Sequence, residues 1–242
     1  MEIIIAKNYR ELSRLAAEAV IRQIRRKPRT VLGLPTGHTP IELYHDLVAA
    51  YQTKKISFRY VSTFNLDEYV GLNQTDPRGY HSYMRKNLFS KVDLKPENEH
   101  ILDGRASNVK KECARFEAQL RKVGGIDLLI LGIGKDGHIG FNEPGSKINS
   151  KTRTVKLSES TRRANAKYFG SAAKVPRRAL TMGIGTIMQA KKIILLAHGK
   201  EKAAIVKQAL SGKISAKIPA SFLRQHRNLI VILDKAAASK LK

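Results

Sequence analysis

The residues of this chain best suited to chemistry are Asp136, His138 and Glu143, which lie within eight residues of one another. They follow the apolar run 126–133, whose length and composition predict a strand buried on both faces. Histidine changes its protonation near neutral pH and a carboxylate can orient the imidazole, so this trio suits acid–base chemistry. A polar surface loop would explain the same three residues equally well.

A second candidate is the turn Gly33-Leu-Pro-Thr-Gly-His-Thr-Pro40, which precedes a helical pattern. The free N–H groups at a helix N-terminus, together with the helix dipole, favour phosphate. Thr36, Gly37 and Thr39 could supply hydroxyl and amide donors. The segment is neither a Walker A nor a GxGxxG loop, so a nucleotide is not indicated. The alternative is a tight turn in which Thr39 and Glu42 form a capping box for the helix.

Two further charged features follow expected strands. Asp67 and Glu68 are adjacent, so we expect one to face a crevice and the other to serve as a structural partner, although a helix cap or a surface charge fits as well. Lys202 lies near the start of a helix, where the dipole disfavours a lysine. Binding of an anion by this lysine and simple exposure to solvent explain its position equally well.

Strand and helix patterns alternate along the whole chain. We expect strands at 2–6, 29–34, 60–65, 126–133, 192–197 and 228–233, and helices after Asn8, at 41–51, from Ser107, near 181–190 and at 201–211, with a polar segment at 146–178. This alternation predicts a single α/β domain over residues 1–242, with an open, largely parallel, Rossmann-like sheet and helices on both faces. Ligands bind beyond the carboxyl ends of such strands, where all four polar features fall, so we expect one common site.

The charge balance is strongly basic. Forty-five Lys and Arg against twenty Asp and Glu give a formal net charge of +25. The basic residues are scattered, with modest clusters at 22–29 and 235–242, and we find neither zinc-finger spacing nor an aromatic-rich basic motif. We therefore expect attraction of anionic substrates or plain solubility, with no specific nucleic-acid partner.

The remaining composition indicates a cytoplasmic protein. No apolar run approaches the roughly 18 residues of a membrane span, and residues 1–7 do not resemble a signal peptide. Cys113 is the single cysteine, so no intrachain disulfide forms. We expect no membrane association.

The chain resembles the glucosamine-6-phosphate deaminase family along essentially its whole length. The most specific matching segments are Asn65-Leu-Asp-Glu-Tyr69 and Asp136-Gly-His-Ile-Gly-Phe-Asn-Glu-Pro144, and the turn 33–40 and the segments 158–169, 175–185 and 199–203 extend the match. The resemblance implies the deaminase/isomerase fold and an enzyme of amino-sugar catabolism. Its reaction would convert glucosamine 6-phosphate and water to fructose 6-phosphate and ammonia, without a metal or an organic cofactor.

The resemblance also implies roles for individual residues. His138, oriented by Glu143 and Asp136, would open the sugar ring, and Asp67 would move a proton from C2 to C1. Asp136 would then stabilise the departing ammonium. The phosphate would be held by six residues: Thr36, Gly37, His38, Thr39, Lys167 and Lys202.

Some positions depart from the family pattern. His38 stands where Gly or Ser is usual and Lys167 where longer members have Arg, which replaces a bidentate fork with a point charge. Residues 157–180 resemble the family's mobile lid. The length of the chain, and Val155 where a basic allosteric residue is expected, resemble the short, non-allosteric members. We therefore expect a monomer, with a homo-oligomer as the alternative.

Three other functions compete with deamination. A sugar-phosphate lactonase would share the fold and a Gly-x-Asp-Gly-His motif, but Asp67-Glu68 and Phe141-Asn-Glu-Pro144 favour the deaminase. A sugar-phosphate-sensing module without catalysis would not need the four candidate catalytic residues together. A non-specific polyanion binder would account for the net charge alone.

Overall fold

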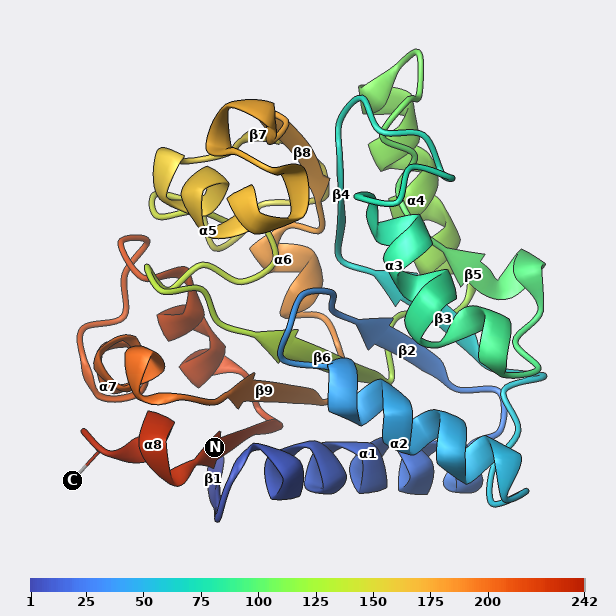
Figure 1. Ribbon diagram of the computed structural model, residues 1–242, viewed down its shortest axis with the longest axis horizontal. Helices are drawn as coiled ribbons and strands as arrows, with labels where there is room; N and C mark the ends of the chain where they lie inside the picture. Colours follow the sequence, from blue (N-terminus) through green and yellow to red (C-terminus); the bar gives the residue numbers. More distant parts are fainter. Residues whose placement is uncertain (242) are drawn as a thin grey trace.

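The computed structural model describes residues 1–241; Lys242, the last residue of the expected domain and of the basic tail, lies outside the described residues. The centre of the fold is a sheet of seven strands that run in one direction (Figure 1). Their order across the sheet is β1 (Glu2–Ala6), β10 (Leu229–Asp234), β9 (Ile193–Ala197), β6 (Leu128–Gly132), β2 (Val31–Leu34), β3 (Ser62–Asn65) and β5 (Glu99–His100). All six neighbouring pairs are parallel. The six expected strands and the parallel sheet are confirmed.

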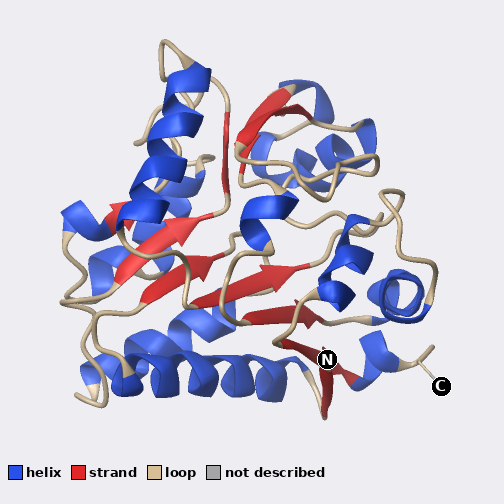
Figure 2. Cartoon of the chain, turned by 180° about the vertical axis from the view of Figure 1, so that it is seen from behind, coloured by secondary structure: helices blue, strands red, loops and turns tan. Residues whose placement is uncertain are grey.

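Helices cover both faces of this sheet, as expected (Figures 1 and 2). Their bounds are α1 (Tyr9–Arg26), α2 (Ile41–Gln52), α3 (Tyr80–Asn87), α4 (Val109–Lys122), α5 (Glu159–Phe169), α6 (Ile184–Ile187), α7 (Ala203–Ser211) and α8 (Lys235–Ala238). Short 3-10 turns lie at Phe89–Lys91, Pro96–Asn98, Ala172–Lys174, Lys200–Lys202 and Pro219–Gln225. None of the helices in residues 1–241 is both long and apolar enough to cross a membrane.

Strand β6 shows why its sequence is apolar throughout. Leu128 and Ile130 join the core formed with α1, α2 and α3, whereas Leu129 and Leu131 join the core formed with α4, α6 and α7. Successive side chains of a strand point to opposite faces, so a strand covered on both sides needs apolar residues at every position. The strand expected at 126–133 is therefore confirmed as a central strand that is covered by helices on both faces.

The helix termini confirm one expected cap and correct two others. Asn8 accepts a hydrogen bond from the Glu11 amide and begins α1 as expected. The cap of α4 is Asn108 rather than Ser107, because the Asn108 side chain accepts from the Lys111 amide. The capping box expected at Thr39 is wrong, since α2 begins after Pro40, which has no side-chain acceptor.

The segment 146–178 is more regular than its polarity suggested. It contains β7 (Arg153–Lys156) and α5, and β8 (Arg178–Thr181) follows. These strands form a second, antiparallel sheet with β4 (Asp67–Tyr69), in the order β4-β8-β7. The helix expected near 181–190 is reduced to the short α6, because residues 178–181 extend into this sheet.

Asp127 fastens the amino ends of three strands of the central sheet. Its carboxylate is only 6% exposed and accepts hydrogen bonds from Lys27 Nζ (2.7 Å), Lys191 Nζ (2.8 Å), Thr30 Oγ1 (3.1 Å) and the Val31 amide (2.9 Å). Burial alone would raise the pKa of Asp127, but these donors outweigh it and lower the pKa to about 2.

We predict that Asp127→Asn lowers the free energy of unfolding by about 2 kcal/mol at pH 7, because charge-assisted bonds to two lysines are lost. The folded-state pKa lies below the unfolded value, so the contribution is present above about pH 4 and disappears as the pH falls toward 2. Urea unfolding of both proteins across this range measures the difference. Asp46→Asn, which removes an exposed pair with Arg10, is the control and should cost less than 1 kcal/mol. Equal stability of Asp127→Asn and the parent at pH 7 would contradict the prediction.

Candidate active site

The central sheet has a switch point between β6 and β2. From β2 the chain passes through α2 to β3 and β5 on one side, whereas β6 leads to β9 and β10 on the other. The loops that leave β2 and β6 therefore diverge at the carboxyl edge and open a crevice between them. In Figure 2 the arrowheads of the central strands point to this edge.

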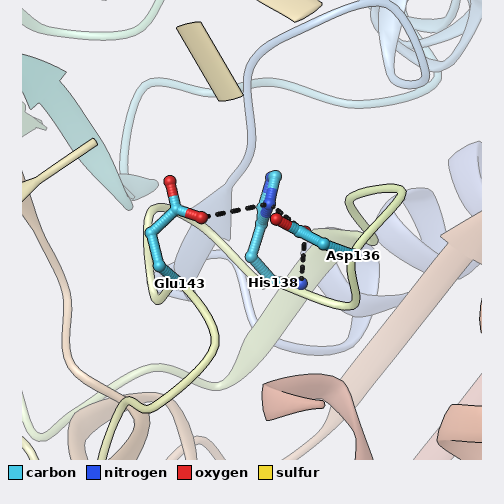
Figure 3. A group of neighbouring side chains, drawn as sticks. All are labelled: Asp136, His138 and Glu143. Carbon is cyan, nitrogen blue, oxygen red and sulfur yellow. Dashed lines mark hydrogen bonds and ion pairs between the residues drawn. The ribbon is translucent and has the colours of Figure 1, made fainter. Parts of the chain in front are cut away.

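His138 is positioned by the glycine-rich turn after β6. Its imidazole lies against Gly134, where any Cβ would overlap the ring, so glycine is required at that position. Its Nδ1 is 2.6 Å from Asp136 Oδ1 and 4.0 Å from Glu143 Oε2 (Figure 3). We assign the proton on Nδ1 to the bond with Asp136, which leaves Nε2 as an acceptor in the neutral ring.

The two carboxylates beside His138 have different surroundings. Burial raises the pKa of Asp136, but the hydrogen bond from His138 and the charge of His138 outweigh burial and lower the pKa to about 2. Asp136 is therefore ionised at neutral pH. Glu143 accepts hydrogen bonds from the Ser158 amide (3.2 Å) and hydroxyl (3.1 Å). Because Ser158 is the N-cap of α5, Glu143 also fixes the start of that helix.

The adjacent carboxyls of Asp67 and Glu68 have different surroundings. Glu68 accepts hydrogen bonds from three backbone amides, those of Tyr69 (2.8 Å), Tyr80 (2.8 Å) and His81 (3.1 Å), so it serves as the acceptor for the first turn of α3. The carboxyl of Asp67 makes no side-chain hydrogen bond within residues 1–241, and the residue is only 5% exposed. Burial, and next the neighbouring charge of Glu68, raise the pKa of Asp67 to about 8.

Gly140 brings the turn after β6 up to Asp67. A Cβ at Gly140 would lie 3.2 Å from Asp67 Oδ2 and 3.1 Å from Thr181 Oγ1, and its φ of +56° also favours glycine. Asp67 and Thr181 face each other in the β4–β8 pair. The loop that carries His138 thus passes directly over the buried Asp67 carboxyl.

The turn 35–40 is held by three tyrosine hydroxyls. Tyr44 donates to the Pro35 carbonyl (2.5 Å), Tyr83 to the Gly37 carbonyl (2.6 Å), and Tyr9 lies 3.2 and 3.1 Å from the His38 and Thr39 carbonyls. These bonds use the carbonyl oxygens, and the backbone amides of 36–39 make no hydrogen bond within the described chain. These amides are therefore free to donate to a bound group.

Sequence reasoning missed these three tyrosines. They lie on α1, α2 and α3, up to 46 residues from the carbonyl they bond, and nothing in their local sequence marks such a role. The same holds for Ser158, whose contact with Glu143 spans 15 residues. Only the fold brings these groups to the site.

The lysines expected at the site differ in placement. The Lys202 ammonium donates to the Ile133 carbonyl (2.7 Å) at the end of β6, and burial lowers the pKa of Lys202. The ring of His198, four residues before Lys202, lies 5.7 Å from the ring of His38. This contact connects the loop after β9 to the loop after β2. Lys167 is exposed on α5, and its contact is with the ring of Tyr168 at 5.0 Å. Within residues 1–241 Lys167 makes no hydrogen bond or ion pair with the other expected site residues.

Asp136, His138 and Glu143 could also hold a cation. Each offers one ligand atom, and these atoms lie within 4.8 Å of one another. An imidazole and two carboxylates are suitable ligands for zinc or a related divalent metal.

The family of glucosamine-6-phosphate isomerases and 6-phosphogluconolactonases matches residues 6–232. A glucosamine-6-phosphate deaminase of Thermoanaerobacter sp. (strain X514) is 50% identical over 99% of this chain and 94% of its own length. The corresponding deaminase of Halothermothrix orenii is 48% identical over the full length of both chains.

Solved structures give a consistent picture. A monomeric glucosamine-6-phosphate deaminase superposes with a TM-score of 0.97 at 46% identity, over 99% of this chain and all of its own. The 6-phosphogluconolactonase of Leishmania guyanensis has a TM-score of 0.77 at 23% identity, over 100% of this chain and 98% of its own. At that identity the second likeness shows a shared fold alone.

We predict that Gly134→Ala displaces the His138 ring and breaks its bond to Asp136. Spectra of the 15N-labelled histidines should show the proton on Nδ1 of His138 in the parent and lose this tautomer preference in the variant. Gly132→Ala, where a Cβ meets nothing within 4 Å, is the control and should leave the His138 signals unchanged. Identical His138 signals in Gly134→Ala and the parent would refute the proposed packing.

Proposed function

The chain belongs to the family of glucosamine-6-phosphate isomerases and 6-phosphogluconolactonases, and we infer that it is a deaminase of that family. It converts glucosamine 6-phosphate and water to fructose 6-phosphate and ammonia. The observation that carries this conclusion is the identity of about 50% with glucosamine-6-phosphate deaminases over the whole chain. The lactonase likeness, at 23% identity, extends to the fold only.

Ring opening is assigned to His138. The closed sugar opens when a proton moves from the C1 hydroxyl to the ring oxygen. Nε2 of His138 is free to accept and return that proton, because Nδ1 is engaged with Asp136 at 2.6 Å. The ionised Asp136 stabilises the imidazolium formed in between, and Glu143 supports the ring from its other side.

Isomerisation is assigned to Asp67. In the open chain Asp67 removes the proton from C2 and the C1 oxygen takes up a proton, which gives a C1–C2 enolamine. The same carboxyl then returns its proton to C1 as the amino group gives one up. The product is an imine at C2, which water attacks and which then releases ammonia. A raised pKa suits this role, because a carboxyl titrating near 8 can accept and return a proton at similar cost. We assign to Asp136, which is ionised, the stabilisation of the leaving ammonium.

Phosphate binding is assigned to the turn after β2 together with two lysines. The amides of Thr36, Gly37, His38 and Thr39 and the two threonine hydroxyls are the donors, and the adjoining α2 contributes the positive end of its dipole. Lys202 adds a cation from the loop after β9. Binding at the remote phosphate positions C1 and C2 for the proton transfers.

Lys167 would bind the phosphate only after a movement of residues 157–180. We propose that this segment is the lid of the site. This segment packs through Leu157, Phe169 and Val175 on Tyr69 and Phe141, in a small cluster separate from the two main cores. Closure would carry Lys167 toward the phosphate. We further propose that residues 1–242 form one catalytic domain that acts as a cytoplasmic monomer, with the monomeric deaminase structure as support.

We predict that the purified protein releases ammonia from glucosamine 6-phosphate and does not accelerate hydrolysis of 6-phosphogluconolactone. Asp67→Asn should lower kcat for ammonia release by roughly a thousandfold while KM stays within a few fold, because only the C2–C1 proton transfer is lost. A coupled assay for ammonia and a pH-stat assay for lactone hydrolysis measure both activities. Lactone hydrolysis without ammonia release would make the lactonase the function, and near-normal turnover of Asp67→Asn would remove Asp67 from the base role.

A further inference from the structure

The active site leaves most of the +25 net charge unexplained, but the opposite edge of the sheet gathers much of it. Parallel strands all begin at that edge, and α1, α2 and α4 end there because each leads into the next strand. In Figure 1 β2, β6 and β9 start from the right-hand side, where α1 and α2 end. Basic residues occupy these junctions: Arg22, Arg25, Arg26, Lys27, Arg29, Lys54, Lys55, Arg59, Arg121, Lys122, Lys191, Lys192 and Arg227. We call this set the amino-edge face.

Contacts join several of these residues although they are far apart in the sequence. Arg25 Nε donates to the Lys55 carbonyl at 3.1 Å, which joins the end of α1 to the segment after α2. Lys27 and Lys191 both bind the Asp127 carboxylate. Basic residues that are scattered along the chain are therefore gathered at one edge of the sheet.

Few acidic groups oppose this charge. Asp127 is buried beneath the two lysines, and Asp93 accepts hydrogen bonds from the Ser57 hydroxyl and the Phe58 amide. Glu18 lies 3.8 Å from Arg22 on α1, and Glu2, Glu97 and Glu99 lie at the margins, on the first strand and at the start of β5 or just before it. The amino-edge face is thus strongly cationic.

Helix dipoles explain only part of this pattern. Arg25, Arg26, Arg121 and Lys122 lie in the last turns of α1 and α4, where cations are stabilised. Arg29, Lys55 and Arg59 lie beyond the helix ends, where the dipole gives no such stabilisation. Their concentration is what an anionic partner would require.

Tyr60 gives this face a second feature. The residue is 48% exposed, with the guanidinium of Arg29 at 4.8 Å from the ring centroid and that of Arg59 at 6.0 Å. An exposed aromatic ring among cations becomes a stacking platform for an unpaired base once these guanidinium groups turn from the ring to the phosphates. A lipid surface would need a larger set of apolar side chains, and Tyr60, Met1 and Val123 are the large ones exposed near this edge of the described chain.

We propose that the amino-edge face binds single-stranded nucleic acid without sequence preference, with Tyr60 stacking on a base and Arg29, Lys55 and Arg59 on neighbouring phosphates. The proposal does not rest on the deaminase assignment, because the face lies at the opposite end of the strands from His138 and Asp67. Nucleic acid bound there leaves the catalytic crevice open. Sugar turnover and nucleic-acid binding are therefore separable by mutation.

The test is fluorescence anisotropy with a labelled 20-nucleotide oligo(dT) between 50 and 200 mM KCl. We expect a Kd of roughly 10 µM or tighter at 0.1 M salt, steeply weakened by added salt. R29Q/K55Q/R59Q should weaken binding at least tenfold and flatten the log–log salt slope by about 2, since each phosphate contact contributes about 0.7. Tyr60→Ala should weaken it roughly tenfold, and Tyr60→Phe should keep parental affinity.

A matched variant separates a specific face from overall charge. K207Q/K213Q/K240Q removes the same number of exposed cations from α7, the loop after it and the C-terminal segment, and should leave affinity within twofold of the parent. Ammonia release by every variant should stay within twofold, which shows that folding is intact. Equal losses in the two triple variants, no effect of Tyr60→Ala, or tighter binding to vesicles of anionic phospholipid than to the oligonucleotide would each overturn the proposal.

Discussion

The common direction of the seven central strands is the constraint on which the rest of the structure depends. A parallel pair requires a crossover connection, so every strand end of one kind falls on the same edge. At the carboxyl edge this brings the turns after β2, β6 and β9 together with Asp67, and it opens a crevice where β2 and β6 send their chains apart. The same constraint gathers the helix ends and their basic residues at the opposite edge. The proposed catalytic residues and the amino-edge face therefore lie at opposite ends of the strands.

Within the crevice, environment gives chemically similar carboxyls different tasks. The carboxylate of Glu68 accepts hydrogen bonds from three backbone amides, two of them in the first turn of α3, so Glu68 holds that helix in place. The adjacent Asp67 has no such partner and its pKa rises to about 8, whereas the bond to His138 lowers the pKa of Asp136 to about 2. An ionised Asp136 fixes the imidazole, and an Asp67 that exchanges a proton near neutral pH suits transfer between two carbons.

The sequence predicted those parts of the fold that local pattern determines. The apolar run of β6 and the cap at Asn8 are readable because strand burial and helix capping act over a few residues. The antiparallel sheet of β7 was missed because its residues are polar and half exposed. The tyrosines that hold the phosphate turn, such as Tyr83, and the convergence of basic residues at the amino edge depend on contacts between distant segments, which no local pattern encodes.

The central claim is that the buried Asp67 carboxyl, beside the charge of Glu68, is the base of the reaction. Its pKa is raised, so the basic form increases with pH, and kcat/KM should rise through a midpoint near 8 and then level off. The most direct measurement is this pH profile for the parent and for Glu68→Gln, which removes the like charge and should lower the midpoint while the substrate's own titrations stay fixed. A profile with the same midpoint in both proteins, or one that is flat between pH 6 and 9, would contradict the account.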